Sequence, residues 1–284
     1  MLRQRIPELW SRASALLSAM EWDWLYDEST GLPYGCRYPN GDASEDWHYD
    51  WLCADSRLAH FIGIGTEKIP PDSWNNLNRH KEPSRCIGLW HFEPGWDGGG
   101  LFMPLLPEIF LDEVKSEISL STQNFIKDQI SYYQQINAPA WGSSATALPP
   151  YGEEYCGYGC MRDDILVPHA SILAADYISS KELAQNLLAF EALGAREWVT
   201  DGHEKLDFGF RASVNWQTSE VASVYLVLDQ CMAFLSLANN KANSCIRDLF
   251  CQDDIILNAI NVISDYGNSC VIDEVEITSL KNEK

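Results

Sequence analysis

Two aspartates that interrupt apolar helical patterns are the residues whose placement most suggests chemistry. Asp55 lies four residues after Trp51 and three before Leu58, so a helix over residues 44–62 would turn its carboxylate toward an apolar face. A buried carboxylate must be paired, hydrogen-bonded or neutralised, and such groups often have a shifted pKa that suits acid or base catalysis. A structural ion pair with Arg57 is the alternative interpretation.

The second aspartate interrupts a longer apolar segment. Asp229 and Gln230 are the only strongly polar break in VYLVLDQCMAFLSLA, within a helix expected over residues 219–239. Leucine would suit a core helix better at both positions, so the pair indicates the floor of a cleft. A structural role, in which Asp229 orients a neighbouring loop, is equally open. Six residues of the two apolar stripes should be largely buried: Trp51, Leu58, Ile62, Tyr225, Leu228 and Met232.

Two long loops, residues 86–104 and 139–168, hold further carboxylates and aromatic side chains. Long loops in compact domains are usually functional. Glycosidic bond cleavage needs a carboxylic acid and a second carboxylate about 5–10 Å apart, with aromatic walls for the sugar ring. The loop candidates are Asp97, Glu153, Glu154, Asp163 and Asp164, with Trp96, Trp141 and Tyr158 as an aromatic rim. We expect Asp55 and Asp229 to open on one pocket, with Asn215 and Gln230 as further binding residues. For any single loop carboxylate, a solvated surface charge is the simpler interpretation.

Other catalytic templates find little support. Gly98-Gly99-Gly100 lacks the following Lys-Ser/Thr of a phosphate-binding loop, and no Gly-x-Ser-x-Gly motif occurs. His169 begins an expected helix without an evident Ser or Cys partner, so we interpret it as a structural histidine. Cys156 and Cys160 have no second Cys/His pair at metal-ligand spacing. The sequence therefore indicates neither a metal site nor a cofactor.

Composition excludes several classes of partner. The 284 residues include 20 Lys+Arg and 41 Asp+Glu, a formal charge of −21, which disfavours nucleic acid and anionic lipid. No apolar stretch approaches the roughly 18 residues of a membrane span, and we expect no membrane association. Nine cysteines without paired spacing predict reduced thiols and a cytoplasmic location. Aromatic residues make up 12%, which suits a sugar-stacking cleft as well as a tryptophan-rich core.

Helical periodicity predominates along the chain. Glycine and proline around Asn40-Gly41 indicate a short hairpin, and residues 271–277 have the pattern of a strand. The sequence thus predicts one mainly α-helical domain over residues 1–284, with its long loops at one end. The expected helices span residues 7–27, 44–62, 71–79, 120–136, 168–177, 180–193, 219–239 and 252–264.

Six segments resemble, in order, the glycoamylase-like domain of bacterial endo-β-1,2-glucanases and of cyclic β-1,2-glucan synthases. They are WLYDESTGLPYGCR, YDWLCADSRLAHFIGIGTEKIPPDSW, GGGLFMPLLPEIF, WGSSATA, GYGCMRDDILVPHASILAA and YLVLDQCMAFLSLANN, which together cover about residues 8–240 and leave 241–284 as C-terminal helices and a tail. The resemblance implies an (α/α)6 toroid with a sugar cleft at one end, acting on β-1,2-glucan. It also implies an acidic role at Asp55 and at Asp163, and matches Asp229-Gln230 to the Asp-Gln of the glucanases.

Three departures from the family pattern define the alternatives. Asp55 replaces the usual Glu, Ala145 follows Trp-Gly-x-Ser where the synthases carry Glu, and Gly99-Gly100-Leu101 replaces Phe-Glu-Tyr. Six helical hairpins need more than about 300 residues. Either the toroid is incomplete on its N-terminal side, or a partner or second copy supplies its first helices, or the chain is the rear part of a longer product. The sequence therefore predicts a hydrolase or transglycosylase on an oligosaccharide or glucan, or else a non-catalytic glycan-binding or interaction module.

Overall fold

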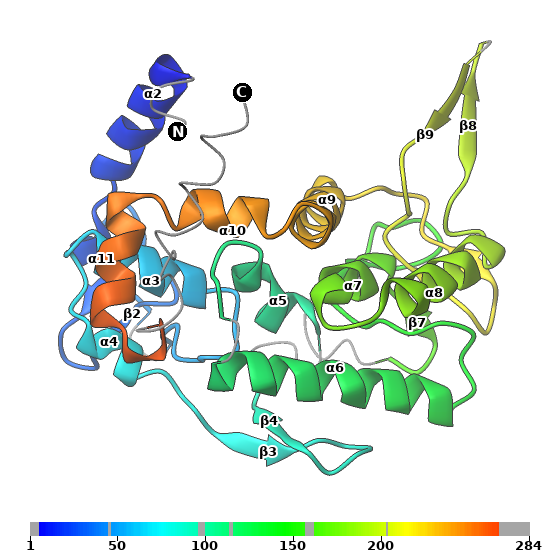
Figure 1. Cartoon of the computed structure of the whole chain (residues 1–284), viewed down its shortest axis with the longest axis horizontal. Helices are drawn as coiled ribbons and strands as arrows, with labels where there is room; N and C mark the ends of the chain where they lie inside the picture. The colour runs from blue at the N-terminus through cyan, green and yellow to red at the C-terminus, as the bar shows by residue number, and fades with distance from the viewer. Residues whose placement is uncertain are drawn as a thin grey trace, which may run out of the picture.

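The computed structural model describes residues 6–44, 47–95, 100–113, 116–156, 162–202 and 204–266, and this part of the chain is mainly helical (Figure 1). The predicted fold class, a mainly α-helical protein, is confirmed. The helices are α2 (Pro7–Ser18), α3 (Arg57–Gly65), α4 (Asp72–Asn75), α5 (Phe102–Glu108), α6 (Glu117–Gln135), α7 (Pro168–Leu173), α8 (Ser180–Ala192), α9 (Val227–Lys241), α10 (Cys245–Phe250) and α11 (Asp254–Val262), with 3₁₀ turns η1 (Trp22–Leu25), η2 (Ala174–Asp176) and η3 (Ser264–Tyr266).

The strands are short and form small antiparallel sheets. A three-stranded sheet has the order β11–β10–β7, with Val214 of β10 paired to Leu166 of β7. The other sheets are two-stranded ribbons, and Figure 1 shows β8–β9 projecting from the body. The strands are β1 (Tyr26–Asp27), β2 (Leu32–Pro33), β3 (Lys81–Pro83), β4 (Trp90–Phe92), β5 (Thr146–Ala147), β6 (Tyr155–Cys156), β7 (Ile165–Leu166), β8 (Trp198–Asp201), β9 (Glu204–Asp207), β10 (Val214–Asn215) and β11 (Glu220–Val221).

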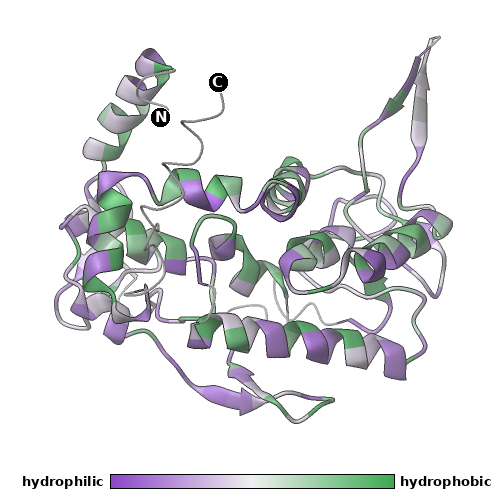
Figure 2. Ribbon diagram, in the orientation of Figure 1, coloured by the Kyte–Doolittle hydropathy of each residue, from purple (hydrophilic) through white to green (hydrophobic). Residues whose placement is uncertain are grey.

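Two large apolar clusters hold the helices together. The first joins α3 to α11, with Phe61 and Ile260 among its buried residues. The second joins α5, α6, α7 and α9 through buried residues such as Leu105, Phe125 and Met232. Each fully buried aliphatic or aromatic side chain contributes about 1.5–3 kcal/mol. Hydrophilic and hydrophobic residues alternate along α6 in Figure 2, as expected of a helix that packs on one face.

Local signals place several helices correctly. Ser179 caps α8 by accepting from the Glu182 backbone N–H, and the Glu182 carboxylate returns the bond, which makes the predicted capping box. Ser116 likewise caps α6. The Asn40-Gly41 hairpin is also confirmed, since the backbone N–H of Gly41 donates to the carbonyl of Tyr38. The predicted tail at residues 271–277 lies outside the described residues.

The helix expected over residues 44–62 is wrong at its start, because α3 begins only at Arg57. The backbone of Trp51 instead forms a parallel bridge with Asn78, and that of Cys53 forms one with Pro94. Asp55 therefore lies in a turn before α3, and the helical-face argument for its burial does not hold. The contacts that replace the helix come from distant segments, which local periodicity cannot reveal.

The expected helix over residues 219–239 begins eight residues late, at Val227, because Glu220–Val221 form β11. Met232 is buried as predicted, whereas Leu228 is 51% exposed and that prediction is wrong. The remaining predicted stripe residues are half-buried: Trp51, Leu58, Ile62 and Tyr225. Helices α5 and α10 were not predicted. In α5 the two prolines, Pro104 and Pro107, obscure the helical pattern, because proline is disfavoured inside helices.

One cysteine is oxidised, although reduced thiols were expected throughout. Cys156 is disulfide-bonded, and sequence spacing did not identify it. Six other cysteines in the described chain are free, as predicted: Cys36, Cys53, Cys86, Cys231, Cys245 and Cys251. No helix in the described residues is long and apolar enough to span a membrane.

Candidate functional site

The starts of α3, α5 and α7 are tied together by hydrogen bonds. Arg57, the first residue of α3, donates from Nη2 to the carbonyl of Pro104 in the first turn of α5, at 2.9 Å. The residue before α5, Leu101, and the residue before α7, Val167, both bond to the short segment 142–143. The described residues at the starts of these helices are therefore linked to one another, next to the loops that hold most of the predicted site residues.

Segment 142–143 is rigidly held. Gly142 has φ +140°, and a Cβ on it would lie 2.6 Å from the carbonyl oxygen of Val167, so only glycine fits. Ser143 is fully buried, and its backbone N–H donates to Oε1 of Gln129 at 3.0 Å. This loop is therefore part of the scaffold of the site.

Asp55 is half-buried in the turn that precedes α3. Burial raises the pKa of its carboxyl above the ordinary value, although the backbone N–H of Ser56 and the charge of Arg57 oppose the shift. The guanidinium of Arg57 donates to Glu113 and to the carbonyls of Leu52, Ala54 and Pro104. These contacts, and not the predicted alternative of an ion pair with Asp55, anchor the guanidinium. A raised pKa favours the protonated form that a general acid needs.

Asp229 and His169 form a buried pair between the first turns of α9 and α7. Asp229 Oδ2 and His169 Nδ1 are 3.1 Å apart, with side-chain exposures of 6% and 4%. Both residues line a cavity of about 20 Å³, a size that holds one water molecule. In the part of the chain that the structure describes, neither ring nitrogen of His169 makes a hydrogen bond of good geometry. Asp229 Oδ2 makes none either. These polar atoms are therefore available to a water molecule in the cavity.

Asp229 lines a small buried cavity, and its assignment to the floor of a sugar cleft stays a prediction. The pairing of His169 with Asp229 was not predicted, because the two residues lie on different helices and are 60 residues apart in the sequence. A histidine in the first turn of an apolar, Pro-initiated helix was the available signal. Asp55 is not among the residues that line this cavity, so a shared pocket for Asp55 and Asp229 stays a prediction.

Gln230 lines the same cavity but acts mainly as a positioning residue. Its Nε2 donates to the carbonyl of Phe210 at 2.7 Å. Gly209 has φ +81°, and a Cβ on it would meet the Gln230 side chain at 2.5 Å. Arg211 also lines the cavity and binds Glu197 at 2.8 Å. Gln230 therefore fixes the loop before β10 against α9.

The other predicted binding residues have structural partners. Asp163 accepts a hydrogen bond from the Tyr132 hydroxyl. Asn215 donates to Asp164 Oδ2 at 2.9 Å, and Arg162 makes a salt bridge to the same carboxylate, which lowers its pKa. These contacts secure the sheet edge before α7 and do not place either residue in the Asp229 cavity.

The remaining predicted residues separate into three groups. Glu153 and Glu154 are exposed in the β5–β6 hairpin. Trp141 lines a different pocket, between α6 and α8. Trp96, Asp97 and Tyr158 lie outside the described residues. In the part of the chain that the structure covers, no three His, Cys, Asp or Glu side chains gather as metal ligands would.

A buried acidic network lies beneath the Asp55 turn and was not predicted. The guanidinium of Arg57 donates to both carboxylate oxygens of Glu113, at 2.9 and 2.8 Å. The Tyr266 hydroxyl donates to the same carboxylate at 2.5 Å, and the Tyr177 hydroxyl donates to Glu108. The network connects α3, α5 and η3, and thereby positions the turn that carries Asp55.

Glu108 should make the protein less stable as the solution becomes alkaline. Burial and the neighbouring Glu113 raise its pKa to about 8. The folded chain therefore holds a proton that the unfolded chain releases above about pH 4.5, so stability falls as pH rises toward 8. Burial lowers the pKa of His60 to about 4, so this residue makes stability rise with pH, but only below about pH 6.5.

We expect Glu108→Gln to flatten this dependence by about 2 kcal/mol between pH 6.5 and 8. Thermal or urea unfolding followed by circular dichroism at both pH values measures the difference. Glu117→Gln, at an exposed carboxylate that starts α6, is the matched control and should keep the wild-type slope. An identical slope in Glu108→Gln and wild type would show that Glu108 is ionised in the folded protein.

The fold is that of a class of solved bacterial proteins, putative glucoamylases and endo-β-1,2-glucanases. One is a putative glucoamylase from Bacteroides uniformis (TM-score 0.70, 17% identity, covering 88% of this chain and 63% of that one). Another is the endo-β-1,2-glucanase of Chitinophaga pinensis, solved in a complex with sophorotriose and glucose (TM-score 0.70, 14% identity, 89% and 63%). A third is the β-1,2-glucanase of Parabacteroides distasonis (TM-score 0.68, 15% identity, 88% and 40%).

These neighbours confirm the resemblance inferred from the six sequence segments. At such identities the likeness establishes the fold alone. The chain spans 63% of the length of the first two proteins and 40% of the third. No protein-family model and no curated protein sequence matches the chain.

Proposed function

We propose that this protein is a carbohydrate-active enzyme that hydrolyses or transfers β-1,2-glucan or a related β-glucoside, and that its helices form part of an (α/α)6 toroid. The observation that carries the proposal is the Asp229–His169 pair beside a water-sized cavity, at the starts of two packed helices. The Chitinophaga pinensis protein of the same fold was solved with a β-1,2-linked glucan fragment, sophorotriose. That fold-level analogy supplies the substrate class.

In the proposed reaction Asp55 is the general acid. It would protonate the glycosidic oxygen as the bond to the anomeric carbon breaks, and its raised pKa favours the protonated form that this step needs. Asp229 would be the second carboxylate, oriented by His169. With a wide separation from Asp55, it would take a proton from the water that attacks the anomeric carbon. With a short separation, it would attack that carbon itself and form a glycosyl ester, which water or a sugar hydroxyl, deprotonated by Asp55, then displaces.

A non-catalytic glycan-binding module is the second candidate. It is favoured by the shorter Asp55 in place of Glu and by the absence of Glu at Ala145 and at Gly99–Leu101. Such a module would keep the polar cavity and bind sugar without turnover.

Incubation of the purified chain with linear β-1,2-glucan is the direct test. We expect shortened β-1,2-linked products by mass spectrometry, and none from β-1,4- or α-1,4-glucans of similar length. Asp229→Asn should lower the rate about 10²–10⁴-fold. Binding of sophorotriose without any turnover, in a folded monodisperse sample, would favour the binding module.

A further inference from the structure

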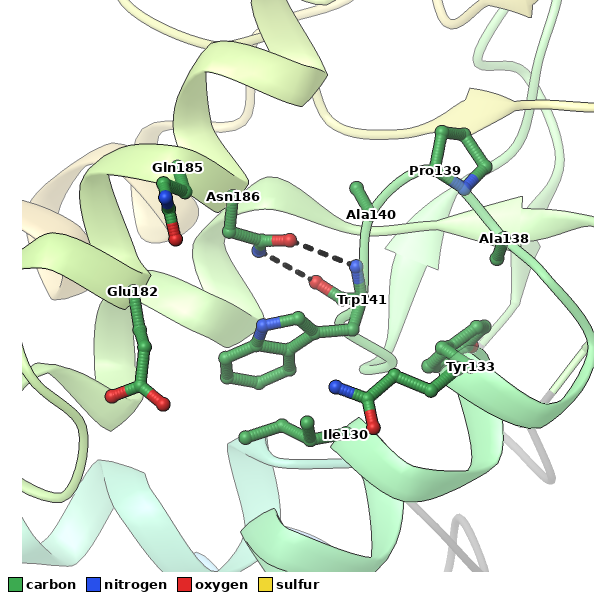
Figure 3. A pocket seen from close by; sticks show the side chains of 10 residues that line it. Ile130, Tyr133, Ala138, Pro139, Ala140, Trp141, Glu182, Gln185 and Asn186 are labelled. Atoms are coloured by element: carbon green, nitrogen blue, oxygen red, sulfur yellow. Dashed lines mark hydrogen bonds between the residues drawn. The ribbon is translucent and has the colours of Figure 1, made fainter.

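A second pocket lies between α6 and α8. Its volume is about 250 Å³, and Figure 3 shows it bounded by Ile130 and Tyr133 of α6, by Glu182 and Gln185 of α8, and by the 138–141 segment. It shares no lining residue with the cavity that contains His169 and Asp229. The mechanism proposed above does not use this pocket.

Trp141 forms the aromatic wall of the pocket, and two hydrogen bonds from the side chain of Asn186 hold its backbone. Asn186 is only 6% exposed, and both halves of its amide bind the backbone of Trp141. Its Oδ1 accepts from the Trp141 N–H and its Nδ2 donates to the Trp141 carbonyl, each at 2.9 Å. Trp141 is half-buried against two apolar clusters, and Figure 3 shows its indole between the side chains of α8 and Ile130. The ring is therefore fixed in place beside the pocket.

The polar side chains around this ring suit a neutral ligand. The carboxylate of Glu182 is oriented by Ser179, whose N–H and Oγ donate to it at 2.9 and 2.6 Å. Gln134 and Gln185 are exposed at the pocket and offer amide donors and acceptors. A flat apolar wall with hydroxyl partners at its edge matches the faces of a pyranose ring. The net charge of −21 and Glu182 disfavour an anionic ligand.

We propose that the pocket at Trp141 is a saccharide-binding site separate from the catalytic residues, which holds one glucosyl residue of a glucan chain against the indole. The choice of a β-1,2-glucan rests on the proposed function, whereas the choice of a neutral pyranose rests on the pocket. Asn186 is a positioning residue, since it fixes the backbone that carries the indole. A site of this kind would retain a long glucan on the protein between cleavage events.

Fluorine NMR of the full chain, labelled with 5-fluorotryptophan, tests the proposal with sophorotriose as the ligand. Trp141→Phe assigns the resonance, and titration to about 10 mM covers the weak affinity of one sugar subsite. We expect a saturable shift of the Trp141 signal and none of Trp198, which is 60% exposed on β8. The shift should persist in the double variant Asp55→Asn, Asp229→Asn, because the pocket does not use either carboxylate.

Two substitutions at the pocket sharpen the result. Gln185→Ala, at an exposed position of α8, should raise the dissociation constant at least threefold. Glu182→Gln should also weaken binding while it keeps the capping box, because glutamine serves the same helix-capping role. Cellotriose and maltotriose, tested alongside, show how far the pocket distinguishes linkages.

Failure of this proposal is distinguishable from failure of the proposed function. A Trp141 signal that no neutral trisaccharide moves would overturn the saccharide site, whatever the turnover assay gives. A shift that disappears in the double variant would also overturn it, because the sugar would then be bound at the catalytic residues. A persistent shift without any glucan turnover would leave the pocket in place and reject the catalytic role.

Discussion

We expect Arg57→Ala to lower the free energy of unfolding by about 3–5 kcal/mol, because it leaves the carboxylate of Glu113 buried without its counter-ion. Arg57 is fully buried and its guanidinium binds Glu113 together with backbone carbonyls of Leu52 and Pro104. A typical domain is stable by only about 5–15 kcal/mol. The variant should therefore unfold at a much lower urea concentration than wild type, as followed by circular dichroism.

Arg196→Ala is the matched control on the surface. Arg196 pairs with two carboxylates, Glu191 and Asp207, but its side chain is 34% exposed. Exposed ion pairs contribute about 0–1 kcal/mol, so this variant should unfold close to wild type. Equal midpoints for the two arginine variants would show that the Arg57 network does not hold the turn before α3.

The sequence predicted best those helices whose ends carry local signals. The capping box at Ser179 and the stop at Gly194 placed α8 (Ser180–Ala192) almost to the residue. Pro168 placed the start of α7 in the same way, because proline is favoured in the first turn. These interactions form within a few residues of one another, so a single sequence contains the information that determines them.

Segments whose partners are distant were predicted poorly. Residues 50–53 have a helical pattern, yet their backbone pairs with Asn78 and Pro94. Glu220–Val221 likewise pair with β10 and delay the start of α9. Long-range pairing of this kind overrides local periodicity, and one sequence without its fold does not show which segments meet.

The same distinction applies to the site. Asp229 was predicted because it interrupts an apolar helix, and its partner His169 was missed because α7 and α9 meet only in the fold. Glu108 followed the apolar run LFMPLLP, which is the same kind of signal, and was not used. Both buried acids, Asp229 and Glu108, are thus single acidic residues within apolar segments of the sequence. The family resemblance, by contrast, selected Asp55 independently of the helix that the structure does not contain.

The largest effect on activity is expected for Asp55→Asn. Removal of a general acid lowers the rate of glycoside hydrolysis about 10²–10⁴-fold. The fold should be unaffected, because the amide oxygen of asparagine can still accept the hydrogen bond from the Ser56 N–H, which is 2.9 Å from Oδ1 in the wild type. Asp50→Asn is the control, since Asp50 is also half-buried with a pKa that burial raises, on the same segment of chain.

The pH profile separates an acid from a residue that only shapes the site. Because Asp55 must be protonated to act, wild-type turnover should fall as pH rises through its raised pKa, and this alkaline limb should be missing from the residual activity of Asp55→Asn. Asp50→Asn should keep both the rate, within about twofold, and the limb. If Asp55→Asn retains the wild-type rate and profile on linear β-1,2-glucan, the acid is another carboxylate. Asp97, one of the loop carboxylates that the sequence offers as candidates, would be the next residue to replace.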